Sequence, residues 1–337
     1  MKPIVTGLMA YGMSGRIFHA PFLTTNPHFQ FKAVVERNQK KAAERYPDVI
    51  SYNKIEDLIN DPEIELIIVN TPSYTHFEYT KAALSAGKHV LLEKPAAATS
   101  AEVKELYDLS RSTGKHLMLY QNRRYDSGFQ MVKQVIDSGR LGELVEVHFR
   151  YDRYRIAIGP KVFKEDNSYP ANGLTYDLGP HLLDQTLALF GKPLSFKKTT
   201  ATHRPNSKVD DYFHFHLTYP NNLNVFLTAS LLVAEPLPAY VIHGTVGSFI
   251  KGQNDSQEAQ LDKGMLPTDE GFGIEPAGSE GKLVIMGADN QKETELLPSY
   301  KGNYNGIFEA VYHTVRENAL FPITEEQIAW QIEMLEA

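Results

Sequence analysis

The first 120 residues alternate between short apolar runs and longer amphipathic stretches. The apolar runs are continuous and rich in Val, Ile and Leu, which is typical of strands buried on both faces of a parallel sheet. They lie at Ile4–Leu8, Phe31–Val35, Leu66–Val69, Val90–Leu92 and Leu117–Tyr120. An alternation of strands and helices of this kind predicts a parallel, doubly wound sheet with right-handed crossovers.

Two of the amphipathic stretches carry the signals of helix ends. Thr75 begins a capping-box spacing, and Gly87 follows that helix where its C-terminal cap is expected. Thr99 and Glu102 repeat the spacing, and Gly114 closes the second helix. In a capping box, two side chains three positions apart satisfy each other's backbone N–H groups. We therefore expect both helices to begin with side-chain caps and to end on glycine.

After about residue 122 the pattern changes from continuous apolar runs to strict alternation. Residues 145–151 (VEVHFRY) and 212–219 (YFHFHLTY) place apolar side chains on one face and polar side chains on the other. This alternation predicts an antiparallel sheet with one buried face and one polar face. Further strands are expected at 223–230, 240–245, 248–251 and 282–286, helices at 127–138, 306–318 and 325–336, and a long surface loop at 253–281.

Together these patterns predict an α/β fold with two domains. Residues 1–121 are expected to form a dinucleotide-binding (Rossmann) domain around the parallel sheet. Residues 122–337 are expected to form a second, α+β domain with a mainly antiparallel sheet. The polar face of that sheet bears His148, Arg150, Tyr212, His214 and His216. Because this face is broad enough to pair with a copy of itself by two-fold symmetry, we expect a homo-oligomer, a dimer.

Composition narrows the class of protein further. The chain has 337 residues, of which 42% are hydrophobic and 22% charged, as is ordinary for a globular protein of about two domains. It has no cysteine, which excludes disulfides, thiolate metal sites and a cysteine nucleophile. The net charge is −7 and no run of Lys and Arg stands out, which argues against nucleic acid or a membrane as a partner. The N-terminus lacks a signal-peptide pattern and no apolar run approaches ~20 residues, so we expect a cytoplasmic protein.

The segment AYGMSG (10–15) follows the first predicted strand and opens a helix. A dinucleotide fold needs small residues here, because the backbone approaches the pyrophosphate and the helix N-terminus stabilises its charge. Ala10 replaces the first glycine of the usual GxGxxG pattern, which is tolerable where φ stays negative. Gly12 and Gly15 are the other two glycines of the pattern. The segment predicts a pyrophosphate site, and a tight turn without a ligand is the alternative.

Glu36 and Arg37 end the second predicted strand and argue for different cofactors. A carboxylate there accepts both hydroxyls of the adenosine ribose and repels a 2′-phosphate, which favours NAD. A guanidinium there binds the 2′-phosphate and favours NADP. Between NAD and NADP we expect NAD. The alternative is that both side chains are solvated surface charges.

Three polar clusters stand where chemistry is expected. NTPSYTH (70–76) and EKP (93–95) follow apolar strands of the first domain, and ligands of such sheets bind beyond the carboxyl ends of the strands. DLGPH (177–181) lies in the second domain, and in a helix its first and last residues share a face. An aspartate there can hold the tautomer of the histidine while the other ring nitrogen handles a proton. The alternatives are an exposed lysine at a strand end, a capping aspartate and a packed histidine.

The whole chain resembles the Gfo/Idh/MocA family of oxidoreductases, most closely its scyllo-inositol dehydrogenase-like branch, whose members include NADP-linked enzymes. The resemblance is carried, in order, by AYGMSGRIFHAPF, NTPSYTH, AGKHVLLEKP, YQNRRYD and NGLTYDLGPHLLDQ. It implies an N-terminal dinucleotide-binding domain and a C-terminal substrate-binding domain with a large, open antiparallel sheet. NAD(P) and a sugar or polyol are the implied cofactor and substrate, and no metal is implied.

The resemblance also assigns roles to individual residues. The catalytic residues of the family correspond to Lys94, Asp177 and His181. Contacts to the cofactor are implied for Tyr11, Gly12, Gly15, Thr71, Pro72, His76, Glu93 and Lys94. The chain departs from the family pattern at Ala10, and at Asn172-Gly173, where the family often has a glycine-rich run.

These assignments give a mechanism of direct hydride transfer at nicotinamide C4. His181 takes the hydroxyl proton in oxidation, Asp177 orients it, and Lys94 polarises the reacting oxygen. Candidate substrate contacts are Asn122, Arg123, Tyr154 and Arg155. The alternatives are an NAD-dependent glycosidase, a cofactor-sensing regulatory protein of the same fold and a structural protein without catalysis.

Overall fold

Six parallel strands form the first sheet of this computed structural model, which describes residues 2–159, 162–252 and 255–337. The strands are β1 (Ile4–Leu8), β2 (Phe29–Val35), β3 (Ile50–Tyr52), β4 (Leu66–Val69), β5 (His89–Glu93) and β6 (Leu117–Tyr120). Their order in the sheet is β3-β2-β1-β4-β5-β6, and every pairing is parallel. The chain therefore changes its direction of winding between β1 and β4, which is where doubly wound sheets bind ligands.

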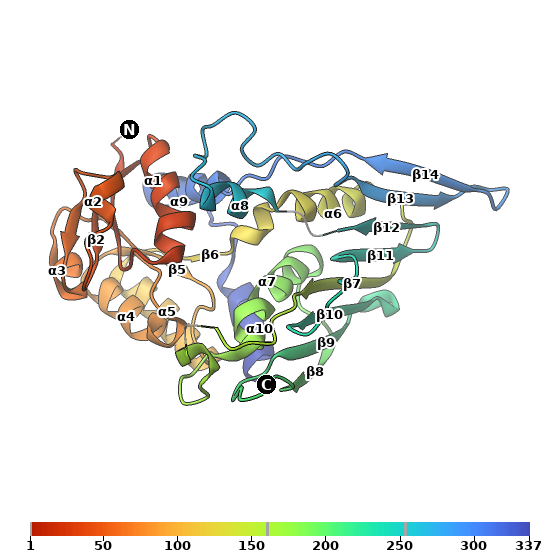
Figure 1. Cartoon of the computed structure of the whole chain (residues 1–337), viewed down its shortest axis with the longest axis horizontal. Coiled ribbons are helices and arrows are strands. Elements are labelled where there is room, and N and C mark those ends of the chain that lie inside the picture. Colours follow the sequence, from red (N-terminus) through yellow and green to blue (C-terminus); the bar gives the residue numbers. More distant parts are fainter. Residues whose placement is uncertain (1, 160–161, 253–254) are drawn as a thin grey trace. The chain divides into compact units, whose positions relative to one another are not determined.

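Helices cover both faces of this sheet, and Figure 1 shows α1 and α9 on one side of it and α4 and α5 on the other. The helices of this unit are η1 (Gly15–His19), α1 (Ala20–Thr25), α2 (Ala42–Arg45), α3 (Ile55–Asn60), η2 (Ser73–Thr75), α4 (His76–Ser85), α5 (Ser100–Thr113), α8 (Ser256–Asp262), α9 (Asn305–Glu317) and most of α10 (Glu325–Glu336). The predicted doubly wound α/β sheet is confirmed.

Of the two predicted capping boxes, one is confirmed and one is wrong. Thr99 and Glu102 form both reciprocal hydrogen bonds at the start of α5, and Gly114 ends that helix at a φ of +64°. Thr75 makes no side-chain cap for α4, because the short helix η2 precedes it and holds its backbone near helical angles. Its hydroxyl instead donates to the carbonyl oxygen of Pro72, at 2.6 Å.

Two segments from the second half of the chain, residues 257–272 and 304–332, belong to the first unit, although we had expected them in the second domain. The first unit comprises Met1–Asn122, Gln257–Phe272 and Tyr304–Ile332, and the second comprises the remaining residues. Residues 304–332 join the first unit through the apolar face of α9, where Phe308 stacks on Phe22 of α1 with ring centroids 5.0 Å apart. The predicted surface loop 253–281 was also wrong in part, because it contains α8 and buries Leu261.

The second unit is built on eight strands in the order β14-β13-β12-β11-β7-β10-β9-β8. Their bounds are β7 (Leu144–Asp152), β8 (Ser195–Ala201), β9 (Tyr212–Thr218), β10 (Asn224–Ser230), β11 (Tyr240–Gly244), β12 (Gly247–Lys251), β13 (Gly281–Met286) and β14 (Lys292–Leu297). All pairs are antiparallel except β7 with β10. The sequence missed β3, β8 and β14, which are edge strands and too short or too polar to show an apolar run.

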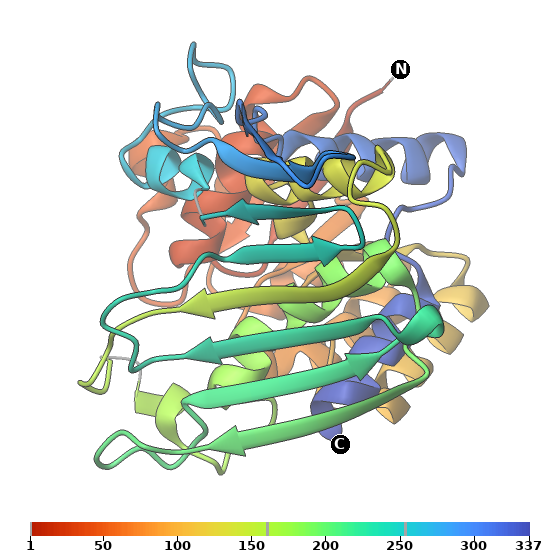
Figure 2. The ribbon, with the colours of Figure 1, turned by 90° about the vertical axis from the view of Figure 1, so that its right-hand side faces the viewer.

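The two faces of this sheet have different partners. Its apolar side chains, including Val147, Phe149, Phe213 and Phe215, are fully buried beneath α6 (Ser127–Asp137) and α7 (Gly173–Phe190). Val145, expected on the same face, is 49% exposed at the end of β7. Among the described residues of this unit, no helix lies on the opposite face, which is turned toward the viewer in Figure 2. The remaining helices of the unit are the short turns η3 (Asn122–Tyr125), η4 (Val162–Glu165) and η5 (Pro220–Asn222).

An ion pair without solvent exposure fastens the segment after α8 to this sheet. Lys251 of β12 and Glu275 are each 0% exposed in their side chains, with Nζ 2.7 Å from Oε2. Ser299 and Ser127 donate hydroxyl hydrogen bonds to the same carboxylate, so its lone pairs are well satisfied. A buried pair of this kind is costly to break, because the remaining charge is left uncompensated.

We therefore expect Lys251→Met to lower the free energy of unfolding by about 3–5 kcal/mol, because Glu275 would remain as a buried, unpaired charge. Lys133→Met is the matched control, since Lys133 pairs with Asp137 on the exposed surface of α6. Urea unfolding followed by circular dichroism measures both changes. Equal, small shifts in the two variants would show that the buried pair has no such role.

Candidate active site

The two glycines of the turn after β1 differ in their surroundings. A Cβ atom at Gly15 would lie 2.2 Å from the carbonyl oxygen of Ala10, so only glycine fits there. A Cβ atom at Gly12 would meet nothing within 4 Å, so the backbone there is open to approach. Ala10 lies outside the positive-φ region, so its side chain causes no strain in place of glycine. The turn thus has the close packing and the open backbone that a pyrophosphate site requires.

Asn70 joins the carboxyl ends of β1 and β4 on either side of the switch point. Its Oδ1 accepts from the backbone N–H of Ala10 at 2.9 Å, and its Nδ2 donates to the carbonyl of Ala10 at 2.8 Å. These paired bonds fix the start of the glycine turn relative to β4. The sequence placed Asn70 in a polar cluster but gave no signal of this contact.

His76 connects the loop after β4 to the loop after β5. Its ring is buried, with Nδ1 2.7 Å from the carbonyl oxygen of Pro95 and Nε2 2.9 Å from that of Thr71. Burial lowers the pKa of His76, although its hydrogen bonds to the two carbonyl oxygens act in the opposite direction. The ring therefore holds two strand-end loops together, and the cofactor contact that the resemblance implied for His76 stays a prediction.

Glu93, at the end of β5, contacts residues at the two ends of η1. Its Oε1 accepts from the hydroxyl of Ser14 at 2.7 Å and lies 2.9 Å from Nε2 of His19. Burial would raise the pKa of Glu93, but these hydrogen bonds and the charge of Lys94 outweigh it and hold the pKa below its usual value. Glu93 therefore fixes the strand end from which the half-buried Lys94 projects, directly before a cis bond to Pro95.

Glu36 has a structural task that its sequence position did not reveal. Its side chain is buried, and Oε1 accepts from the backbone N–H groups of Lys41 and Ala42 at 2.8 and 3.1 Å. Oε2 accepts from the hydroxyl of Ser51 at 2.7 Å. Oε1 thus caps α2, and Oε2 binds the edge strand β3. Arg37 is exposed, with Nη2 3.4 Å from the hydroxyl of Tyr79.

The other residues expected around a cofactor keep open surface at the same strand ends. Tyr11 is half-buried and packs edge-to-face on Tyr46, with ring centroids 6.4 Å apart. Thr71 and Thr75 share a hydrogen bond of 2.7 Å between their hydroxyls, and Pro72 is exposed. The first unit therefore presents one edge, at the carboxyl ends of β1, β4 and β5, that combines an open glycine turn with a lysine.

In the second unit, α7 carries both Asp177 and His181, so the predicted helical spacing is confirmed. His181 is 7% exposed, with its ring centroid 6.5 Å from that of Tyr151. Asp177 is more exposed, and its Oδ1 lies 3.5 Å from Nζ of Lys164. The helix begins under Asp210, whose Oδ2 accepts from both the backbone N–H and the hydroxyl of Thr175, each at 2.7 Å.

The next turn of α7 is fixed by buried polar contacts. Asp184 is 2% exposed and accepts two hydrogen bonds from the guanidinium of Arg124, at 2.7 and 2.8 Å. Burial raises the pKa of Asp184, against the opposing effect of Arg124. Gln185 donates to the carbonyl of Arg123 at 3.0 Å. His181 is thus carried by a helix segment whose position is set by hydrogen bonds as well as by packing.

Two of the four candidate substrate contacts lie in the interior of the protein. Asn122 and Arg123 are buried. Nη1 of Arg123 lies 3.3 Å from Oδ2 of Asp126 and 3.6 Å from Oδ2 of Asp255. Its charge thus faces two carboxylates of the protein, and a contact of Arg123 with a substrate stays a prediction. Tyr154 is 60% exposed and Arg155 is also exposed, so both stay candidates.

Two other classes of site are absent from the part of the chain that the structure describes. No three His, Asp or Glu side chains are placed there to hold a metal ion. No helix among the described residues is long and apolar enough to cross a membrane.

Comparisons with known proteins match both units to one group of enzymes. Residues 4–121 match the model of an oxidoreductase family with an NAD-binding Rossmann fold, and residues 129–250 match the GFO/IDH/MocA C-terminal domain. The chain is 36% identical to scyllo-inositol 2-dehydrogenase (NADP(+)) IolW of Bacillus subtilis, over 99% of this chain and 92% of that protein. It is 38% identical to the uncharacterised oxidoreductase C115.03 of Schizosaccharomyces pombe, over 100% and 96%. The solved structure of YvaA from Bacillus subtilis superposes with a TM-score of 0.93 at 35% identity, covering 100% of this chain and 96% of YvaA.

Proposed function

The chain belongs to the Gfo/Idh/MocA family of oxidoreductases, and we propose that it is an NAD(P)-dependent dehydrogenase acting on a CH–OH group of a sugar or polyol. One observation carries the proposal: the open glycine turn lies at the switch point between β1 and β4, and Lys94 directly follows the next strand, β5. The name of the relative IolW supports an inositol-like substrate. The cytoplasm, which holds the pools of both nicotinamide cofactors, is the compartment in which we propose that it acts.

The residues at the edge of the first sheet fit a dinucleotide. The open backbone at Gly12 and the N-terminus of the helix that begins at Gly15 suit the two negative charges of a pyrophosphate. Thr71 and Pro72, at the end of β4, would border the nicotinamide half, with Lys94 beside them. The cofactor, when bound, supplies or accepts the hydride, and the protein supplies position and electrostatics.

Two side chains act on the reacting CH–OH group in this proposal, and a third acts on one of them. Lys94 donates a charge-assisted hydrogen bond to the oxygen and stabilises the negative charge that develops on it. His181 accepts the hydroxyl proton in the oxidative direction and returns it in reduction. Asp177, four residues earlier on α7, orients the imidazole and stabilises its protonated form. No metal ion has a part in this scheme.

The sequence led us to expect NAD as the cofactor, but the surroundings of Glu36 and Arg37 lead us to propose NADP. Both oxygens of Glu36 already accept hydrogen bonds from α2 and Ser51, which leaves this carboxylate fewer acceptor positions for a ribose. Arg37 is exposed beside it and carries a charge that suits a 2′-phosphate. The NADP(+) in the name of IolW supports the same preference.

We expect Arg37→Ala to weaken the binding of NADPH about tenfold and to leave the binding of NADH nearly unchanged. The reason is the loss of one exposed, charge-assisted contact to a phosphate, worth about 1–2 kcal/mol. Titrations of reduced-cofactor fluorescence measure both affinities, with Arg111→Ala, on the exposed surface of α5, as the control. Equal weakening of both cofactors would place Arg37 away from the adenosine ribose.

We also propose that the polar face of the second sheet pairs with a second copy of the chain. Phe226 lies at its centre, between the rings of His148 and His216, with centroid distances of 4.9 and 4.6 Å. Beside them, Glu146 pairs with His148 and Arg150 with Asp152, so the face carries both signs of charge and can complement itself. Light scattering at micromolar concentration is expected to give the mass of a dimer, and a monomer mass would contradict this.

The proposed activity is tested by titrating the protein with NADH and NADPH and then supplying a panel of polyols and aldoses. A dehydrogenase yields net reduced cofactor with a free polyol. A glycosidase that oxidises only transiently cleaves a glycoside and releases none. A cofactor-sensing regulator binds the cofactor and turns over neither. Cofactor binding with net reduction by at least one polyol is the result that the proposal predicts.

A further inference from the structure

A second lysine lies beside the proposed catalytic pair of α7. Nζ of Lys164, in the short helix η4, is 3.5 Å from Oδ1 of Asp177, and the two side chains are 50% and 42% exposed. An exposed ion pair contributes only about 0–1 kcal/mol to stability and is often incidental. The importance of this one depends on whether other contacts hold the two residues in place.

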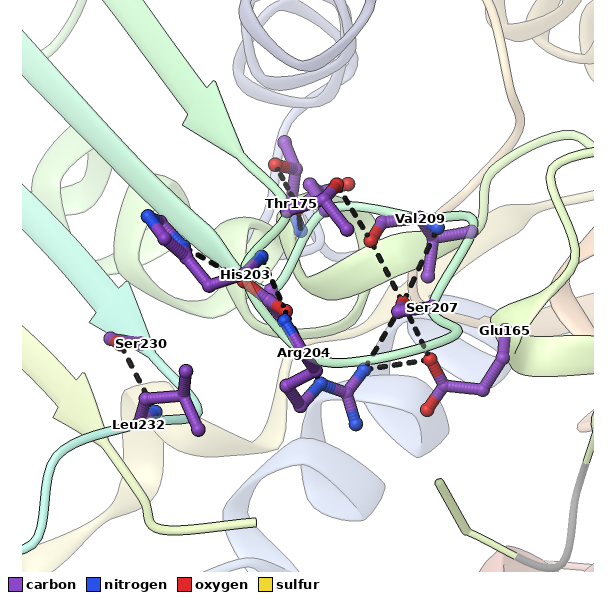
Figure 3. A network of polar contacts seen from close by, with 11 residues as sticks. Glu165, Thr175, His203, Arg204, Ser207, Val209, Ser230 and Leu232 are labelled. Carbon is purple, nitrogen blue, oxygen red and sulfur yellow. Dashed lines mark hydrogen bonds and ion pairs between the residues drawn. The ribbon is translucent and has the colours of Figure 1, made fainter. Parts of the chain in front are cut away.

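One loop, residues 202–211, holds η4 from one side. Figure 3 shows Arg204 and Ser207 of this loop pointing at the carboxylate of Glu165, the residue next to Lys164. Nη2 of Arg204 donates to Oε2 of Glu165 at 2.6 Å, and the hydroxyl of Ser207 donates to the same oxygen at 2.9 Å. The backbone N–H of Lys208 donates to the carbonyl of Glu165 at 3.3 Å. The guanidinium of Arg204 is 3% exposed, so the attachment is sheltered from water.

The same loop holds the start of α7. The carboxylate of Asp210 caps Thr175, as described above, and its carbonyl accepts from the N–H of Leu174 at 3.0 Å. Gly173 has a φ of +85°, and a Cβ atom there would lie 2.1 Å from Oδ1 of Asp210, so only glycine permits this close approach. The loop therefore holds the two segments that carry the Lys164–Asp177 pair, through Arg204, Ser207, Lys208 and Asp210.

We propose that Lys164 is a positioning residue of the active site, which offsets the charge of Asp177 and so keeps His181 neutral and able to accept a proton. This inference rests on the proposed function, in which His181 is the base. A carboxylate four residues before a histidine on one helix favours the imidazolium. A cation on that carboxylate reduces this effect and also repels the imidazolium directly, so both contributions have the same sign.

In the part of the chain that the structure describes, other charged groups near this stretch of α7 have partners of their own. Among the described residues, the titratable and charged groups on the elements that contact this part of α7 are Asp177 and Asp184 of α7 itself, Arg123 and Arg124 of η3, Asp126, Tyr151 of β7, Lys164 of η4, Asp210 of the 202–211 loop and Tyr240 of β11. Arg124 neutralises Asp184 with two hydrogen bonds, and Asp126 and Asp255 flank Arg123. Burial raises the pKa of Tyr151 above its usual value, so that side chain stays neutral. Among the described contacts, the pair of Asp177 and Lys164 is one whose charge balance a single exposed substitution can change.

The test compares Lys164→Met with Lys164→Arg and with a matched control. Lys192→Met is the control, because Lys192 pairs with Glu333 at 3.4 Å and both side chains are about as exposed, at 52% and 51%. Two quantities are measured: the acid limb of the pH profile of kcat/KM for polyol oxidation, and the titration of the His181 ring in ¹⁵N-histidine spectra of the protein without substrate. The His181 signal is assigned with His181→Asn.

In Lys164→Met we expect both the acid limb and the His181 titration to move to higher pH by about 0.5–1 unit, since a half-exposed charge acts through partial screening. Lys164→Arg should restore the wild-type values and Lys192→Met should match them. An unchanged His181 titration in Lys164→Met would overturn the inference, and with normal turnover the proposed function would survive. If the wild-type protein oxidises no polyol, the proposed function fails, and the titration alone still decides whether Lys164 acts on His181.

Discussion

Replacing His181 by alanine is expected to leave a protein that binds NAD(P) normally and oxidises its polyol about 10²–10⁴-fold more slowly, the usual contribution of a positioned acid–base group. Cofactor affinity should persist because the glycine turn, Thr71 and Pro72 all lie in the first unit, whereas His181 lies on α7 in the second. The expected loss is therefore in kcat. Steady-state kinetics combined with a cofactor-fluorescence titration separates the two effects.

The control for this substitution is His313→Ala. His313 lies on the exposed surface of α9 and pairs there with Glu317, so its removal should change neither quantity. Near-normal turnover in His181→Ala would contradict its role as the proton acceptor. A parallel loss of cofactor affinity would instead mean that His181 contacts the dinucleotide.

Lys94→Ala is expected to lower kcat/KM by about 10²–10³-fold, because the variant loses the charged donor to the oxygen on which negative charge develops. In contrast to His181→Ala, it should also weaken cofactor binding, since Lys94 stands at the end of β5 where the nicotinamide half is expected. Lys94→Arg keeps the charge but not its compact geometry, and it should restore only part of the activity.

Lys81→Ala serves as the control for Lys94, because Lys81 is an exposed lysine of α4 paired with Glu105. It should behave like the wild-type protein in both assays. If Lys94→Ala retained near-normal turnover, the proposed mechanism would be wrong, although the dinucleotide-binding fold would stand.

The sequence was sufficient for the elements whose signal is local. The apolar runs located five of the six parallel strands, and alternation located the central strands of the second sheet. The helical spacing of Asp177 and His181 and the glycine requirement at Gly15 also follow from neighbours within a few residues. Three of the four edge strands were missed, because β3 has only three residues and the side chains of β8 and β14 are mostly polar.

The sequence was insufficient where a partner distant along the chain decides what a side chain does. Glu36 has the chemistry to bind a ribose, but Ser51 and the N-terminus of α2 engage its carboxylate. His76 could contact a ligand by its type and place, but two carbonyls enclose its ring. Residue type states what a group is able to do, whereas only the fold shows which neighbour it already has.

The packing of the C-terminal segments was missed for the same reason. Residues 304–332 read as amphipathic helices in either domain, and partners distant along the chain assign them to the first unit, such as Phe22 stacked on Phe308 and Glu65 paired with Arg316. Asp210 likewise gave no local signal of its role, since it caps a helix that begins 37 residues before it.

The transfer of label from substrate to cofactor tests the central claim most directly. The protein is incubated with oxidised cofactor and inositol that carries deuterium on its CH–OH carbons, and the reduced cofactor is examined by NMR. We predict deuterium at nicotinamide C4 in the wild-type reaction, and loss of that transfer in both Lys94→Ala and His181→Ala. Reduced cofactor without deuterium at C4, or label transfer that persists at the wild-type rate in both variants, would contradict direct hydride transfer at this site.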